Sequence, residues 1–258
     1  MSSLPDLPVT HILPALDAAL AGHASAVLVA PPGAGKPTLV PIHLLDAGWR
    51  GDGVIVLLEP RRLAARAAAR RMAQLLNEEP GETVGYRMRL ESRVSAKTRI
   101  LVVTEGVFAR MILADPDLKG VACVLFDEFH ERSLDADFGL ALALDVQAAL
   151  RDDLKILVMS ATLDGARVAS LLGDAPVIES EGRAYPVDIR HRDRKPDERI
   201  ENAMARAIRD ALAEETGSIL AFLPGQGEIH RTARLLEDRL PANVVLAPLY
   251  GAMEGRDP

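Results

Sequence analysis

Two adjacent carboxylates, Asp127 and Glu128, follow directly on an apolar run that begins at Val121, and His130 comes two residues later. Two acids at the carboxyl end of a strand suit a site for a nucleotide and Mg²⁺. Residues 30–38 read Ala-Pro-Pro-Gly-Ala-Gly-Lys-Pro-Thr, close to the glycine-rich loop that brings backbone N–H groups against phosphates. Together the two motifs predict ATP and Mg²⁺ as ligands and an ATP-driven motor as the type of protein.

The predicted phosphate loop follows a strand and precedes a helical pattern that ends near Leu45. In such a loop the glycines allow a tight turn, Lys36 reaches the β- and γ-phosphates, and the helix offers its positive end. The alternative is an ordinary Gly/Pro connection, which the carboxylate pair disfavours. The candidate nucleotide-binding residues are Pro32, Gly33, Ala34, Gly35, Lys36, Pro37 and Thr38.

Pro37 departs from the usual loop, in which the residue after the lysine is Ser or Thr and its hydroxyl holds Mg²⁺. Proline removes that hydroxyl and one N–H, although the first turn of a helix tolerates it. Our hypothesis is that Thr38 or a water partly replaces the lost ligand. Nucleotide binding is then expected to survive better than hydrolysis.

The acids have different predicted tasks. Asp127 is expected to hold Mg²⁺ through water, together with Thr38, and Glu128 to polarise the attacking water. His130 leaves three roles open, as a coupling group, a metal ligand or a surface histidine; the lack of nearby His or Cys partners disfavours zinc. Asp127, Glu128 and His130 are the predicted catalytic residues.

Short apolar runs alternate with helical patterns along the chain, which predicts an α/β fold with a mostly parallel sheet covered on both faces. Ligands of such sheets gather beyond the carboxyl ends of the strands, where both motifs lie. The predicted strands are residues 26–29, 54–58, 100–103, 121–126, 156–159, 219–223 and 244–246, and the main helices are 63–76, 134–150 and 200–212.

Gly and Pro interrupt the pattern near residues 181–186, and a polar run follows at 191–199. We predict a domain boundary there. Residues 1–185 contain enough strands for a complete α/β domain, whereas 186–258 hold only the beginning of a second one.

Composition narrows the class of protein. The chain has 258 residues, a net charge of −7 and one cysteine, Cys123, within a predicted buried strand. No basic leader and no stretch of about 18 uncharged apolar residues is present, so a soluble protein of the cytoplasm is expected. Residues 60–99 hold ten Lys/Arg against four acids. Arg62, Arg66 and Arg70 share one helix face, which is either a solvated face or a phosphate-binding surface.

Five motifs occur in a fixed order: APPGAGK at 30–36, EPRRLAAR at 59–66, VTEG at 103–106, DEFHERS at 127–133 and SAT at 160–162. This series resembles the DEAH/RHA-type helicases of superfamily 2. DEFHERS and the FLPGQGEI stretch at 222–229 look most like the bacterial HrpB group of ATP-dependent RNA helicases. The resemblance implies a RecA-like P-loop NTPase domain at 1–185 and an incomplete second RecA-like lobe at 186–258.

The resemblance also implies roles for individual residues. Arg61, Arg62, Thr104 and Glu105 would contact the backbone of single-stranded nucleic acid, RNA by the resemblance, without reading its sequence. Ser160 and Thr162 would couple the nucleotide site to movement of the second lobe, which residues 222–225 and 249–251 would open. The family's later arginine-rich motif does not follow, so the expectation is a C-terminally truncated helicase.

Three hypotheses remain. The first is an ATP-dependent helicase or nucleic-acid-stimulated ATPase, and the second is a nucleotide- and nucleic-acid-binding module with little turnover. The third is a remnant whose second-lobe strands lie uncovered and promote aggregation. Salt-dependent RNA binding separates the first two from the third, and ATP turnover separates the first from the second.

Overall fold

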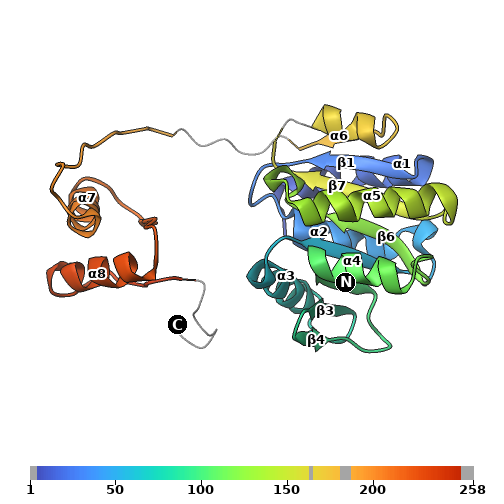
Figure 1. The fold of residues 1–258 in the computed structure, drawn as a ribbon, viewed down its shortest axis with the longest axis horizontal. Helices are drawn as coiled ribbons and strands as arrows, with labels where there is room; N and C mark the ends of the chain where they lie inside the picture. The colour runs from blue at the N-terminus through green and yellow to red at the C-terminus, as the bar shows by residue number, and fades with distance from the viewer. Residues whose placement is uncertain (1–4, 163–164, 181–186, 251–258) are drawn as a thin grey trace. The chain divides into compact units, whose positions relative to one another are not determined.

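The computed structural model describes residues 5–162, 165–180 and 187–250. The chain forms two compact units, residues 1–185 and 186–258 (Figure 1). The predicted boundary at 185–186 falls on residues outside this description. The strands are β1 (Ser25–Val29), β2 (Val54–Glu59), β3 (Val84–Met88), β4 (Glu91–Arg93), β5 (Ile100–Thr104), β6 (Val121–Phe126), β7 (Lys155–Ser160) and β8 (Val177–Glu179). The α-helices are α1 (Leu13–Gly22), α2 (Lys36–His43), α3 (Arg62–Leu75), α4 (Glu105–Ala114), α5 (Leu134–Ala149), α6 (Gly165–Leu171), α7 (Ile200–Glu214) and α8 (Gln226–Leu236).

The first unit is built on one eight-stranded sheet with the order β4-β3-β5-β2-β6-β7-β1-β8. Every neighbouring pair is parallel except β3 and β4, which form an antiparallel edge. The central strands β1, β2, β6 and β7 are buried along almost their whole length, as their continuous apolar sequences predict. The predicted α/β fold with a mostly parallel sheet is therefore confirmed.

Helices cover both faces of this sheet. One core lies under α1, α2 and α3 and includes Leu16, Leu39 and Met72. The other lies under α4, α5 and α6 and includes Phe108 and Leu140. Because parallel strands are joined by these crossover helices, the strand-to-helix loops of β1, β2, β5, β6 and β7 open at the same edge of the sheet. All five sequence motifs lie at that edge.

The sequence-based strand predictions missed β3, β4 and β8. These strands occupy the two ends of the sheet, where neighbours cover them less and the sequence need not be continuously apolar. β3 carries Gly85 and the exposed Arg87, and β8 has only three residues. Predictions based on continuous apolar runs therefore found the centre of the sheet and not its ends.

The predicted strands at 219–223 and 244–246 are wrong. In the described part of residues 187–250 the regular elements are α7, α8 and a short 3₁₀ turn, and α7 packs against α8 through Ala205, Ala233 and Leu236. An extended segment becomes a strand only when a neighbour accepts and donates its backbone hydrogen bonds. With no strand formed in that part of the unit, Phe222 and Val245 lie largely exposed.

Candidate nucleotide-binding site

The loop between β1 and α2 has the backbone that a phosphate cradle needs. Gly33 and Gly35 have φ of +77° and +93°, the left-handed region that favours glycine. A Cβ on Gly35 would also lie 2.9 Å from Leu7 Cδ1. Pro37 falls in the first turn of α2, where its missing N–H breaks no helical hydrogen bond. The local sequence therefore folds as a phosphate loop despite the proline.

Lys36 is folded beneath this loop. Its side chain is 2% exposed, and Nζ donates hydrogen bonds to the carbonyl oxygens of Ala30 (2.7 Å) and Pro31 (3.4 Å). The ammonium group is thereby kept at the loop, and its charge acts on the carboxyl group of Asp127, which follows β6, two strands along the sheet from β1. To reach a phosphate, it must exchange these carbonyl oxygens for phosphate oxygens.

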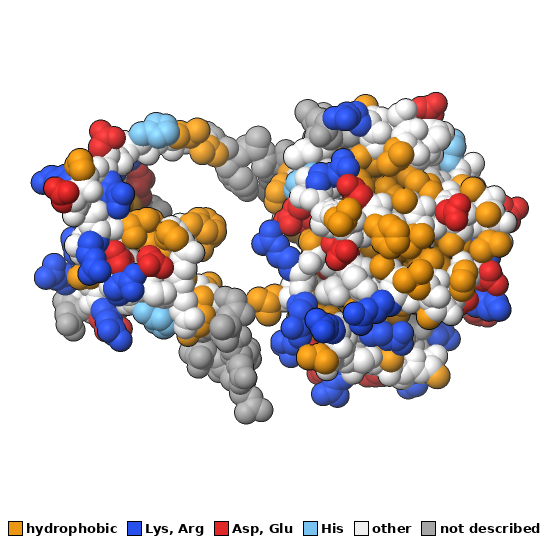
Figure 2. Space-filling view, in the orientation of Figure 1, with side chains coloured by type: hydrophobic (Ala, Val, Ile, Leu, Met, Phe, Trp, Pro, Cys, Tyr) orange, Lys and Arg blue, Asp and Glu red, His pale blue; other side chains and the backbone are white. Residues whose placement is uncertain are grey.

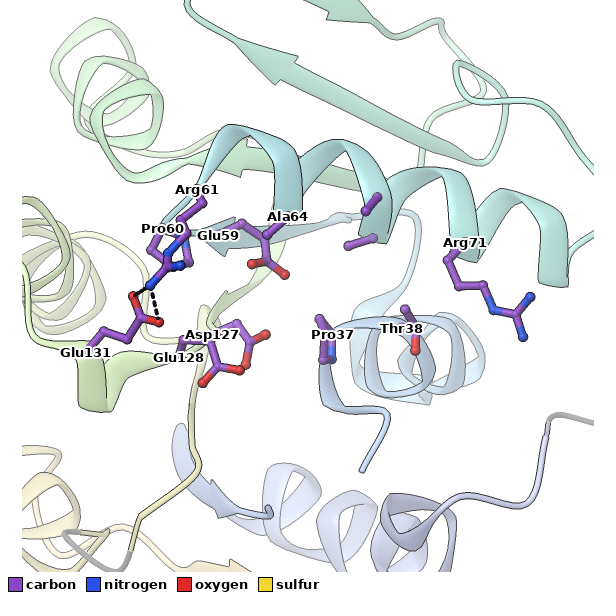
Figure 3. Close-up of a pocket in the computed structure, with 12 residues that line it drawn as sticks. Pro37, Thr38, Glu59, Pro60, Arg61, Ala64, Arg71, Asp127, Glu128 and Glu131 are labelled. Atoms are coloured by element: carbon purple, nitrogen blue, oxygen red, sulfur yellow. Dashed lines mark hydrogen bonds and ion pairs between the residues drawn. The ribbon is translucent and has the colours of Figure 1, made fainter. Parts of the chain in front are cut away.

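The acids after β6 sit on a strained turn. Asp127 is 5% exposed, and Glu128 adopts a left-handed backbone with φ of +48°. Left-handed backbone at a non-glycine residue costs on the order of 1–3 kcal/mol and is common at functional sites. Phe129 anchors the turn because it is buried edge-on against Phe126, with ring centroids 6.3 Å apart. This geometry turns the Glu128 carboxylate towards the loop opening (Figure 3).

A second buried acid, Glu59 at the end of β2, lies beside Asp127. Burial, together with the charges of Asp127 and Glu128, raises the pKa of Glu59 to about 8. Burial also raises the pKa of Asp127 to about 7, with the charge of Glu128 adding to the rise and that of Lys36 opposing it. Two carboxylates in contact cannot both ionise cheaply without a cation, so the pair shares a proton at neutral pH.

The donor chemistry at this point fits Mg²⁺. Asp127 Oδ1 is buried and has no hydrogen-bond partner, although a buried carboxylate oxygen normally has one. No group of three His, Cys, Asp or Glu within the described ranges forms a ready-made metal cage. Mg²⁺ needs no such cage, because it is usually held by one or two carboxylates, substrate phosphates and waters.

His130 links the acids to the end of β7. Its Nδ1 accepts a hydrogen bond of 3.2 Å from the Ala161 N–H, and its Nε2 lies 3.3 Å from Glu128 Oε2. Because Nδ1 accepts, the ring proton of the neutral tautomer is on Nε2 and faces Glu128. Beside Ala161, the hydroxyl of the buried Ser160 accepts from the N–H of the exposed Thr162 at 3.3 Å. Of the three roles left open for His130, this geometry favours the coupling group.

Some of these residues line one pocket of about 450 Å³ (Figure 3). Pro37 and Thr38 face the three acids Glu59, Asp127 and Glu128 across it. Its lining comprises Pro37, Thr38, Glu59, Pro60, Arg61, Ala64, Ala67, Ala68, Arg71, Asp127, Glu128 and Glu131. The structure thus brings Pro37 and Thr38 of the predicted loop to the same cavity as Asp127 and Glu128, whereas residues 32–36 and His130 are not part of its lining.

The four predicted nucleic-acid contacts lie on neighbouring strand ends, since Glu59 pairs with Thr104 in the sheet. Arg61, at the start of α3, donates two hydrogen bonds to Glu131, of 2.9 and 3.0 Å. Glu105 accepts a 2.6 Å hydrogen bond from Ser133, the N-cap of α5. Arg62 is exposed. Figure 2 shows Lys and Arg side chains gathered over the part of the first unit that holds α3, β3 and β4.

Three charged lining residues, Glu59, Arg71 and Glu131, were not predicted from the sequence. Glu59 carried a signal, because it is the one acid of an otherwise apolar strand and is buried in the middle of the sheet. Arg71 lay within an arginine-rich helix, where spacing alone does not show which side chain faces a cavity. Glu131 belonged to a recognised motif, yet its partner Arg61 is seventy residues away.

No helix in the described part of the chain is long and apolar enough to cross a membrane. The Gly251 of the predicted 249–251 segment lies outside the described residues.

Comparison with known proteins gives consistent matches. The family model for DEAD/DEAH box helicases matches residues 13–171. The chain is 54% identical over 251 residues to the ATP-dependent RNA helicase HrpB of Escherichia coli, covering 97% of this chain and 31% of that protein. It is 34% identical to an ATP-dependent RNA helicase HrpA homologue of Haemophilus influenzae, covering 97% of this chain and 19% of that protein.

Solved structures agree with these matches. A crystal structure of the Escherichia coli DEAH/RHA helicase HrpB aligns with a TM-score of 0.91 at 54% identity, over 96% of this chain and 32% of that one. A second, of the Escherichia coli DExH-box NTPase HrpB, aligns with a TM-score of 0.84 at 52% identity, over 98% of this chain and 31% of that one. The chain therefore spans about a third of the length of HrpB and 19% of the HrpA homologue. The predicted RecA-like helicase fold is confirmed.

Proposed function

Because the chain belongs to the DEAD/DEAH box helicase family, we propose that it binds and hydrolyses ATP in response to nucleic acid, as part of an ATP-dependent RNA helicase. The observation that carries this proposal is the common pocket, in which the phosphate loop faces a buried acid with an unpartnered oxygen, Asp127. A phosphate loop and a metal-binding acid, here after β1 and β6 at the same edge of the sheet, are two parts that phosphoryl transfer requires.

The phosphate loop would hold the triphosphate. The left-handed backbone of Gly33 and Gly35 shapes the turn that would hold the phosphates, and the positive end of α2 adds to the attraction for phosphate. Lys36 would exchange its bonds to Ala30 and Pro31 for bonds to the β- and γ-phosphates. Because the side chain is buried, water screens the attraction between its ammonium group and the phosphates less.

Asp127 and Thr38 are the proposed metal ligands, Asp127 through water. When bound, Mg²⁺ supplies charge neutralisation between the phosphates. Asp127 must be ionised for this task, and the nearby charge of Lys36 favours that form. Its unpartnered Oδ1 is available to bond a metal-held water.

Glu128 is the proposed residue that orients and polarises the attacking water. Its strained backbone directs the carboxylate into the pocket, and His130 faces it through Nε2. The bond from the Ala161 N–H to His130 Nδ1 fixes the ring orientation. A change at Glu128 is thereby transmitted to residues 160–162, the proposed coupling segment with Ser160 and Thr162.

Single-stranded RNA is the proposed partner, held through its phosphates by Arg61 and Arg62 with Thr104 and Glu105 nearby. The basic surface over α3 and the β3–β4 hairpin supports this choice (Figure 2). Glu105 is a carboxylate and repels phosphate, so its part is to hold Ser133 and the start of α5 in place. We propose residues 1–185 as the ATP-binding domain and 186–258 as the start of the second lobe.

A second candidate function is nucleotide and nucleic-acid binding with little turnover. The observation that favours it is Pro37, because the pocket lacks the hydroxyl that normally completes the metal site. Thr38 only partly replaces it, because its hydroxyl comes one residue later, about 100° further round the helix, and is turned towards the Gly35 carbonyl at 3.3 Å.

Steady-state ATP hydrolysis by the purified 258-residue chain, with and without single-stranded RNA, tests the proposal. Glu128→Gln serves as the blank, because it keeps the shape of the side chain and removes the base. RNA-stimulated turnover that the variant lacks supports the ATPase. Turnover equal to the blank, with ATP still bound, supports the binding module instead.

A further inference from the structure

Glu59 is a buried acid to which the proposed mechanism gives no task. It ends β2, is 3% exposed and lines the nucleotide pocket. Its neighbour in the pocket, Asp127, directly follows the adjacent strand β6. The backbone N–H of Asp127 donates to the Leu58 carbonyl at 3.1 Å, which sets the two acids at the same level of the sheet. Figure 3 shows the carboxyl groups of Glu59 and Asp127 turned towards the same space.

A buried acid of this kind is costly unless a partner offsets it. Among the described residues, no hydrogen bond or ion pair joins Glu59 to a basic side chain, and Lys36 is bound to loop carbonyls instead. Independently, Asp127 Oδ1 is buried and unpartnered in the same space. A cation with its bound waters would offset the charges of these two acids and give the unpartnered oxygen of Asp127 a hydrogen-bond donor.

The opposite wall of the pocket lacks what Mg²⁺ normally finds there. Pro37 has no hydroxyl, and the hydroxyl of Thr38 comes one residue later, about 100° further round α2, and is turned towards the Gly35 carbonyl, to which it donates. A metal ion at this position therefore lacks, on the α2 side, the hydroxyl that Ser or Thr would offer in place of Pro37. On the β2 side it finds the carboxylate of Glu59. The carboxylate is the stronger attraction for a hard cation, since it carries a charge.

We propose that Glu59 is a positioning residue for the Mg²⁺ of the bound nucleotide, accepting a hydrogen bond from a metal-held water and compensating for Pro37. This inference rests on the proposed function, because it needs a nucleotide in the pocket. It gives the metal site a second acid beside Asp127. It also explains why an acid ends the central strand β2.

Binding of a fluorescent, non-hydrolysable ATP analogue, titrated with Mg²⁺, tests this role without relying on turnover. Glu59→Gln is expected to raise the Mg²⁺ concentration for half-maximal binding by roughly 10-fold, the usual effect of losing an outer-shell partner of a metal. In EDTA at neutral pH the same variant is expected to bind the analogue about as tightly as the wild type, because the pair that shares a proton and the variant with ionised Asp127 both carry one negative charge. Loss of structure would instead weaken binding under both conditions.

Two further variants control the experiment. Glu179→Gln makes the same chemical change at the exposed end of β8, outside the pocket lining, and is expected to leave the Mg²⁺ dependence unchanged. Glu59→Asp keeps the charge on a shorter side chain and is expected to need less Mg²⁺ than Glu59→Gln. The thermal midpoint of each variant confirms that it is folded.

The outcomes separate this inference from the proposed function. If the wild type binds the analogue and Glu59→Gln shows the same Mg²⁺ dependence, the role of Glu59 is overturned and the proposed nucleotide site is not. Equal weakening of the variant with and without Mg²⁺ also overturns it. Absence of analogue binding by the wild type, with or without Mg²⁺, overturns both.

Discussion

The buried pair of Glu59 and Asp127 predicts that the first unit loses stability as the pH rises. The pKa of Glu59 is raised from 4.5 to about 8, so the folded state keeps a proton that the unfolded chain releases. Below pH 4.5 both states carry that proton. Between pH 4.5 and 8 only the folded state carries it, so the free energy of unfolding falls as the pH rises, and above pH 8 the loss is complete.

The magnitude follows from the shift in pKa. At about 1.4 kcal/mol for each pKa unit, a rise from 4.5 to about 8 corresponds to an upper limit of about 5 kcal/mol. Asp127 shares the proton, and the open pocket admits water to the second charge, so we expect about 2 kcal/mol of this to be measured. Glu59→Gln removes one charge and adds an amide that can donate to the orphaned Asp127 Oδ1. The variant should therefore gain about 2 kcal/mol at pH 9 and little at pH 5.

Urea unfolding in EDTA at pH 5, 7 and 9 measures this difference. Trp49, the single tryptophan, packs against the core of the first unit, so its fluorescence reports on that unit. Glu179→Gln, an exposed glutamate, is the matched control and should follow the wild type. Wild type and Glu59→Gln losing stability in parallel between pH 5 and 9 would refute the reasoning, because the pair would then not share a proton.

Three further predictions concern the loop and the coupling histidine. Pro37→Thr restores a hydroxyl beside the metal site and is expected to raise ATP turnover several-fold; unchanged turnover and Mg²⁺ affinity would contradict the role given to Pro37. His130→Ala removes the link between Glu128 and Ala161, so we expect ATP binding within about threefold of the wild type and loss of RNA stimulation, measured by hydrolysis with and without RNA; intact stimulation would exclude the link. Gly35→Ala places a Cβ 2.9 Å from Leu7 at a φ of +93° and should cost about 1–3 kcal/mol in urea unfolding, whereas an unaffected midpoint would show that the loop relaxes freely.

Local signals were enough to predict the centre of the fold. The runs that became β1, β2, β5, β6 and β7 are apolar without interruption, because both faces of each strand are buried. Signals of that kind fail where burial is partial or pairing is absent. β3 and β4 at the sheet edge were missed, and the apolar residues 219–223 were wrongly predicted as a strand because a run of apolar residues does not reveal whether a neighbour exists to pair with it.

The motifs at 30–38 and 127–130 were readable from the sequence alone, since the chemistry of phosphate and metal binding dictates residue types at fixed spacing. What the tertiary structure decided is which distant side chains meet. The sheet order sets β2 beside β6, and only this brings Glu59 against Asp127 and Arg61 against Glu131. The shifted pKa values and the tautomer of His130 follow from that packing, because burial and neighbouring charges are properties of the folded chain and not of any local stretch of sequence.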